Sequence, residues 1–173
     1  MVYRIYVEKK EGFRNEANAL LAEVRGSLGI SGIRGIRVLN RYDAENMDEE
    51  LFVRSVSGVF SEPQVDDVYS ELNSEPGDVV FAVEYLPGQF DQRADSASEC
   101  IQLISKGERP LIHSAKVYIL SGDLSDSDIS AIKGHLINPV EAREASLELP
   151  ETLVTEYGVP DDVEILEIGR AHV

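Results

Sequence analysis

The sequence predicts an α+β fold in which two similar strand-helix-strand-helix units form one pseudo-twofold antiparallel sheet with helices packed on it. One reason is that alternating patterns of period two and apolar spacings of three and four follow each other in the same order in both halves. Another is a constant offset of 77 positions between three apolar pairs: Phe13 and Phe90, Ala17 and Ala94, Val24 and Ile101. A single unit would leave strand edges open, whereas two units can pair them.

The first half shows two strand patterns and two helical patterns before a polar turn around Pro76-Gly77. Its expected elements are a strand over residues 2–8, an amphipathic helix over 13–28 that ends near Gly29, a strand over 36–41, a short helix capped by Asn46 or Asp48 that continues to Phe60, and an apolar patch of unassigned type over 65–72.

The second half repeats this order. Its expected elements are a strand over residues 78–85, a helix over 90–104 that ends at Gly107, a strand over 113–120, a helix from the N-cap Ser125 to Ile137, and a short final strand over 144–149. Two further pairs support the repeat, because Pro63 matches Pro139 at an offset of 76 and Asp43 matches Asp123 at an offset of 80.

The repeat defines the expected domain organisation. The 173 residues suffice for one domain of ordinary size, and we assign residues 1–149 to it, with halves of about 1–76 and 77–149. Residues 150–162 lack a clear period and contain two prolines, which is typical of a linker, so we assign residues 150–167 to the start of one.

The net charge limits which partners the protein can bind, and the cysteine content limits the cellular compartment in which we expect it. Asp and Glu number 32 against 16 Lys and Arg, for a net charge of -16, which disfavours nucleic acid and anionic membrane as partners. This charge serves solubility or forms a docking surface for a basic partner. Because Cys100 is the single cysteine, and because there is neither a signal-peptide pattern nor an apolar run of about 18 residues, we expect a cytoplasmic protein.

No residue is predicted to be catalytic, to bind a cofactor or to ligate a metal. The three histidines lack a spacing that would place two on one helical face, and Cys100 stands beside Glu99 rather than in a basic environment. Asp91 and Asp95 are expected to interact favourably with the N-terminus of their helix. The glycines between residues 29 and 35 form a helix-to-strand turn and not a phosphate-binding loop.

Five segments, in order along the chain, resemble the N-terminal part of large, single-chain phosphoribosylformylglycinamidine synthases. The longest segment is 84–97, at the junction of the second half's first strand and helix. The others are 3–10, 37–43, 60–66 and 138–144. The resemblance extends over about residues 2–167.

The resemblance implies a function for the complete protein. That family converts formylglycinamide ribonucleotide, glutamine and ATP into formylglycinamidine ribonucleotide in purine biosynthesis, with magnesium assisting phosphoryl transfer. Its N-terminal domain resembles a fused dimer of the small, separate PurS-type subunit of other bacteria. This domain bridges the synthetase and glutaminase domains and helps shape the internal ammonia route. The family's catalytic, ATP and magnesium residues lie beyond this chain, so the fragment alone is expected to be inactive.

A polar cluster at the strand-to-helix corner is the expected contact with the other domains. Its members are Tyr85, Gln89, Asp91, Gln92, Arg93 and Asp95. The alternative is that this cluster only caps the helix and fixes the corner. A second alternative concerns the whole protein, which would then be a free-standing duplicated α+β module that binds a small regulatory ligand between its halves.

The end of the sequence departs from the family pattern. Residues 167–173 can be encoded by DNA that resembles a common sequencing-library adapter. We therefore hypothesise that residues 168–173 are a non-native tail on a truncated gene, and that the native reading frame continues past Glu167.

Overall fold

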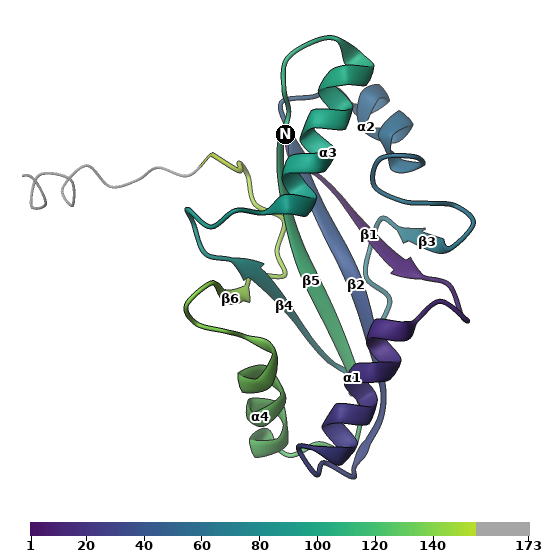
Figure 1. Cartoon of the computed structure of the whole chain (residues 1–173), viewed down its shortest axis with the longest axis vertical. Coiled ribbons are helices and arrows are strands. Elements are labelled where there is room, and N and C mark those ends of the chain that lie inside the picture. Colours follow the sequence, from purple (N-terminus) through teal and green to yellow (C-terminus); the bar gives the residue numbers. More distant parts are fainter. Residues whose placement is uncertain (155–173) are drawn as a thin grey trace, which may run out of the picture.

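The computed structural model describes residues 1–154, and these form a six-stranded antiparallel sheet with four helices (Figure 1). The strand order is β3-β1-β2-β5-β4-β6. The elements are β1 (Tyr3–Lys9), α1 (Asn15–Gly26), β2 (Ile33–Glu45), α2 (Glu49–Val56), β3 (Asp66–Tyr69), β4 (Val79–Tyr85), α3 (Gln92–Ser105), β5 (Leu111–Gly122), α4 (Asp126–Leu136) and β6 (Ala142–Ala145). The predicted α+β class and its duplicated antiparallel sheet are confirmed.

The two halves have the same strand register at a constant offset. The pair Ile5 and Tyr42 in β1 and β2 recurs, 76 positions later, as Phe81 and Tyr118 in β4 and β5. Likewise, the β1–β3 register recurs between β4 and β6 at the same offset. The halves meet where β2 pairs with β5. Each half therefore contributes three strands, and a pseudo-twofold axis passes between β2 and β5.

All four helices cover one face of the sheet, and each of their two cores combines both halves. One core joins Phe52 of α2 to Ile101 of α3, and the other joins Val24 of α1 to Ile132 of α4. Figure 1 shows this arrangement, with α2 and α3 at one end of the sheet and α1 and α4 at the other. Because neither core can be completed by one half, the halves are expected to fold as one cooperative unit.

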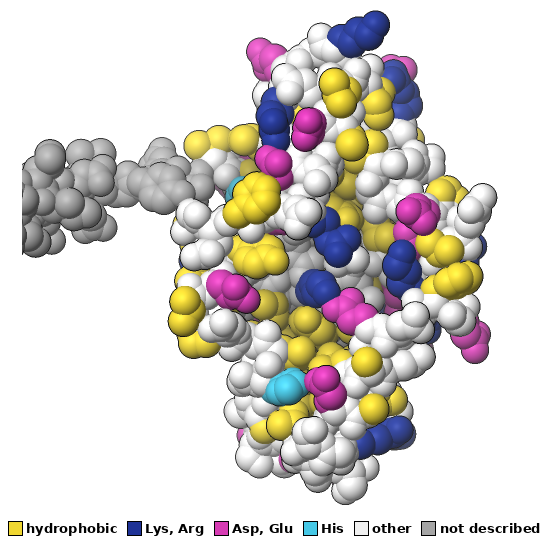
Figure 2. Space-filling view, in the orientation of Figure 1, with side chains coloured by type: hydrophobic (Ala, Val, Ile, Leu, Met, Phe, Trp, Pro, Cys, Tyr) yellow, Lys and Arg dark blue, Asp and Glu magenta, His cyan; other side chains and the backbone are white. Residues whose placement is uncertain are grey.

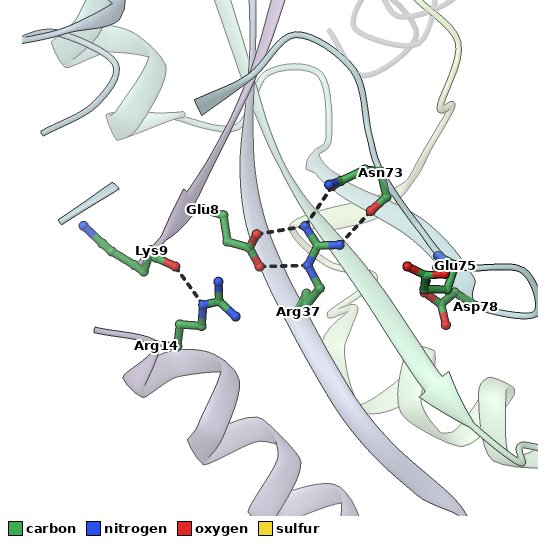
Figure 3. A network of polar contacts seen from close by, with 7 residues as sticks. All are labelled: Glu8, Lys9, Arg14, Arg37, Asn73, Glu75 and Asp78. Atoms are coloured by element: carbon green, nitrogen blue, oxygen red, sulfur yellow. Dashed lines mark hydrogen bonds and ion pairs between the residues drawn. The ribbon is translucent and has the colours of Figure 1, made fainter. Parts of the chain in front are cut away.

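None of the helices in residues 1–154 lies on the opposite face of the sheet, yet Leu39, Ala82 and Val117 on that face are completely buried. Two irregular segments cover it: residues 70–78, which follow β3, and residues 146–154, which follow β6. Figure 3 shows how the first is held: Arg37 pairs with the buried Glu8 at 2.8 and 3.0 Å and donates to the Asn73 carbonyl at 2.6 Å.

The second covering segment is held by the same kind of contact. Arg4 donates to the Leu147 carbonyl at 2.9 Å, and Arg41 donates to the Ser146 carbonyl at 2.8 Å. The Leu153 backbone N–H donates to the Glu45 carboxylate at 2.6 Å. Residues 150–154 of the expected linker thus lie against the sheet. Its remaining residues and the expected non-native tail lie outside the described residues.

Several sequence predictions need correction. The patch at residues 65–72 contains a strand, so each half ends in a third strand, β3 or β6. The final strand was placed too late, because β6 (Ala142–Ala145) precedes most of the predicted range 144–149. The match of Asp43 to Asp123 is wrong, since Asp43 lies inside β2 while Asp123 follows β5. The other offsets, of 76 and 77, agree with the structure.

Candidate functional site

The corner between β4 and α3 brings most of the predicted contact residues together. Tyr85 ends β4 and is 46% exposed. Gln89 follows in the turn, where its N–H donates to the Leu86 carbonyl at 3.0 Å. Gln92 and Arg93 begin α3, and both are exposed. We call residues 85–93 the β4–α3 corner.

Asp91 fixes the geometry of this corner. Its carboxylate accepts hydrogen bonds from the backbone N–H of Ala94 at 3.0 Å, as the N-cap of α3, and from the N–H and hydroxyl of Ser114 at 3.0 and 2.8 Å. An N-cap acceptor satisfies a helix N–H that has no intrahelical partner. The predicted capping role of Asp91 is therefore confirmed, and the same carboxylate attaches α3 to β5.

Asp95 does not join the other predicted residues. It lies in the first turn of α3, as expected for an acidic residue near a helix N-terminus, and it pairs with Arg109 at 2.5 Å. This pair ties α3 to the loop before β5. Both partners are almost half exposed, so the pair contributes little to stability.

The β4–α3 corner separates two hollows, one on each face of the sheet. The hollow on the helix side has a volume of about 640 Å³, and the one on the opposite side about 320 Å³. Tyr85 and Asp91 line both. The predicted residues thus border two concave surfaces, which no sequence pattern indicated.

The helix-side hollow has a twin across the pseudo-twofold axis. The twin measures about 380 Å³, and its lining residues Val7, Asn40, Tyr42 and Phe60 correspond, at an offset of 76, to Val83, Lys116, Tyr118 and Leu136 of the larger hollow. Asn40, Tyr42 and Arg93 line both hollows, so the two adjoin at the axis. Between the two helix pairs, the centre of the sheet is therefore left partly uncovered.

Charges of both signs meet at this centre, as Figure 2 shows in the middle of the helix face. Arg93 donates to the Tyr42 hydroxyl at 3.4 Å, and Lys116 forms an ion pair with Glu16. Arg93 is exposed as a residue, but its guanidinium is partly buried, and this partial burial lowers its pKa. The hydrogen bond to Tyr42 and the nearby acidic charges more than offset that effect, so the pKa of Arg93 is raised overall. Burial, with a smaller contribution from Glu16, raises the pKa of Tyr118 to about 12.

Asn40 lies on the floor of both hollows. Its side-chain oxygen is buried and has no hydrogen-bond partner among residues 1–154. A buried acceptor without a partner is costly, and such groups commonly mark a place where a water or ligand binds.

The other hollow contains buried charges that the sequence reasoning missed. Arg4 and Asp43 form a bidentate pair, with bonds of 2.6 and 2.8 Å. Arg41 is also buried. Its pKa is lowered mainly by this burial and, to a smaller extent, by repulsion from Arg4. The sequence signal for these residues was the strand alternation, which places them on the face opposite the apolar residues that the helices cover.

Comparisons with known proteins add no family assignment. No protein-family model matches the sequence, and no curated protein matches it. Within residues 1–154, no helix is both long and apolar enough to cross a bilayer, and no group of three or more His, Cys, Asp or Glu side chains is placed to hold a metal ion.

Proposed function

We propose that this chain is the N-terminal scaffolding segment of a phosphoribosylformylglycinamidine synthase, an ATP-dependent ligase of purine biosynthesis that uses glutamine as nitrogen donor. The observation that carries the proposal is the constant strand register of the two halves, which is what a fused dimer of a small subunit requires. The five sequence segments that resemble this family add independent support.

In such an enzyme the segment acts by holding other domains together. Ammonia released by a glutaminase domain must reach the synthetase domain without escaping into water, where protonation removes its nucleophilic lone pair. A rigid platform that closes the interface between these domains serves that need. ATP, magnesium and the catalytic residues belong to the rest of the same protein, which we place in the cytoplasm, and the isolated chain is expected to be inactive.

The β4–α3 corner is the surface that we assign to this contact. Tyr85 is 46% exposed and Phe90 is 69% exposed at its tip. Exposed aromatic side chains beside polar ones are typical of protein interfaces, because they bury a large area at low entropic cost. Asp91 keeps the corner rigid, so little ordering would be needed on docking.

The test is association with separately expressed synthetase and glutaminase domains of a related synthase, measured by calorimetry or co-purification. Phe90→Ser should weaken association about tenfold or more, since central aromatic contacts dominate interface energies. Phe13→Ser is the matched control, because Phe13 occupies the corresponding position in the first half and is 50% exposed. Absence of association, or equal effects of both substitutions, would contradict the assignment.

The second candidate is a free-standing module that binds a small regulatory ligand. The observation that favours it is the pair of adjoining hollows at the axis, with the unpartnered Asn40 oxygen on their floor. Calorimetry with amino acids and nucleotides separates the two candidates. Tight binding of such a ligand, without association with the enzyme domains, would favour the regulatory module.

A further inference from the structure

Arg41 is a buried cation without a buried anion to match it. Only 5% of the residue is exposed. Among residues 1–154, no carboxylate lies within ion-pair distance of its guanidinium, and its hydrogen bond goes to the uncharged Ser146 carbonyl at 2.8 Å. The nearby carboxylate of Asp43 is already engaged by Arg4 through two bonds.

This arrangement is electrostatically incomplete. Two guanidinium groups lie near each other in the interior, and the nearby Asp43 carboxylate is bonded to Arg4 and not to Arg41. An arginine keeps its proton under all ordinary conditions, so burial cannot neutralise it. The chain contains 32 acidic residues against 16 basic ones, and a shortage of carboxylates therefore does not explain the missing partner.

The unused donors of Arg41 border open space. A guanidinium carries five N–H groups, and the Ser146 carbonyl accepts from only one of its nitrogen atoms. Among the described residues, the buried side-chain polar atoms without a hydrogen bond are Asn40 Oδ1 and Asp66 Oδ1, and the latter forms an ion pair with Lys9 at 3.0 Å. No nitrogen of Arg41 is therefore sealed inside the protein without a partner. Arg41 instead lines the hollow of about 320 Å³ between the β4–α3 corner and residues 146–154.

We propose that this hollow binds a small carboxylate, which the guanidinium of Arg41 recognises. A planar guanidinium matches a planar carboxylate through two parallel hydrogen bonds. The turn at Gly88 and Gln89 and several of residues 146–154 line the hollow, so the ligand would lie in a half-open concave site.

The charges around the hollow select a monoanion over a phosphate dianion. Three arginines line it: Arg4, Arg41 and Arg143. The carboxylates that line it are Asp43, Glu84, Asp91 and Glu148. The first three of these are engaged by Arg4, Arg143 and Ser114, yet they still repel a second negative charge on the ligand. With four carboxylates against three arginines, the lining carries a formal net charge of -1. The ligand anion is therefore held by the remaining donors of Arg41 alone, and a second negative charge on it would be repelled more strongly.

Recognition at Arg41 does not depend on the proposed scaffolding role, although the turn at Gly88 and Gln89 belongs both to this hollow and to the β4–α3 corner. The hollow lies on the face opposite the helices, and it would bind its ligand whether or not the chain belongs to a synthase. The regulatory module considered above would use the helix-side hollows instead, so substitutions can distinguish the two sites.

The test is a titration of the isotope-labelled chain with sodium acetate, followed by NMR at an ionic strength held constant with sodium chloride. Saturable shifts are expected at the Arg41 side-chain N–H and at the amides of Gly88, Gln89 and Ser146. Arg41→Met should weaken acetate binding at least tenfold. Arg34→Met, which alters an exposed arginine of the same strand, should leave it unchanged.

Titration with inorganic phosphate at pH 8, where it is mainly a dianion, tests the preference for a single negative charge. Phosphate should bind at least tenfold more weakly than acetate. If the Arg41→Met variant does not fold, Arg41→Lys is used in its place, since lysine keeps the positive charge but lacks the planar guanidinium. The chemical-shift changes of the wild-type chain locate the site in either case. The proposal is overturned if the acetate shifts do not saturate, if they fall elsewhere, or if phosphate binds as well as acetate.

Discussion

Asn40 and Lys116 stand opposite each other in the central strand pair, 76 positions apart, and this pairing places them at the pseudo-twofold axis of the sheet. Two residues at corresponding positions of a repeat can pair directly only where the axis passes between them. The axis therefore runs through the floor of the adjoining helix-side hollows, which both contain Asn40. The symmetry of the fold and the position of these adjoining hollows have the same origin.

Replacing Ile101 by Ala tests whether the halves fold as one unit. Ile101 is completely buried in α3 of the second half and packs in a core with Ile5 and Phe52 of the first. We expect a loss of about 2–5 kcal/mol in the free energy of unfolding, from lost burial and the cavity that remains. Denaturant unfolding, with hydrogen exchange of β1 and β4, should show that both halves lose protection together.

Ile104→Ala is the control for this prediction, since Ile104 lies on the same helix but is 50% exposed. It should change stability by no more than about 0.5 kcal/mol. If Ile101→Ala weakened only the second half, the description of the two cores as shared would be wrong.

Asp91→Ala tests the anchoring of the β4–α3 corner. The substitution removes the α3 cap and both bonds to Ser114, and we expect it to destabilise the protein by about 1–2 kcal/mol. Thermal or denaturant melts measure this. Glu99→Ala, at an exposed position of the same helix, should have almost no effect, and a comparable loss from both substitutions would argue against a specific anchor.

Most of the fold could be predicted from the sequence because each element of the first half has a counterpart in the second, so that two segments support every assignment. Ala17 and Ala94, matched by offset alone, are both buried under their helices, as are Val24 and Ile101. The match of Asp43 with Asp123 failed because their offset of 80 departs from the strand offset of 76, and the residue at offset 76 from Asp43 is Ile119. β3 and β6 have four residues each, too few for alternation to distinguish them from a loop.

The buried charges could not be predicted in the same way. Alternation in β1 assigns Arg4, Tyr6 and Glu8 to one face of the sheet, but it does not say that this face is covered. The cover comes from residues 70–78 and 146–154, which are irregular and have no period. At the candidate site, the sequence indicated the corner and its cap. The helix-side hollows depend on the spacing of helices contributed by different halves, and the opposite hollow depends on the irregular residues 146–154.

Arg37→Met tests the network in Figure 3 that holds the first covering segment. Glu8 is only 2% exposed, and loss of Arg37 leaves its carboxylate buried without a counter-charge. We expect destabilisation of about 3 kcal/mol or more. The double substitution Glu8→Leu with Arg37→Met should recover much of that loss in denaturant melts, because no unpaired charge remains. A double variant as unstable as the single one would contradict this explanation.

Alkaline titration tests the burial of Tyr118. Its pKa is raised to about 12, above the ordinary value of 10.0, so the folded state favours the protonated phenol. The resulting stability is complete below pH 10 and is lost as the pH rises towards 12, by about 3 kcal/mol. Tyr118→Phe should remove this pH dependence from the unfolding free energy between pH 10 and 12, whereas Tyr85→Phe, at an exposed position, should preserve it.

The most direct test of the central proposal is the DNA sequence of the source locus beyond the codon for Glu167. A scaffolding segment of a phosphoribosylformylglycinamidine synthase requires an open reading frame that continues into synthetase and glutaminase domains, and we predict that frame. A genuine stop codon immediately after Val173 would contradict the proposal and leave a free-standing protein.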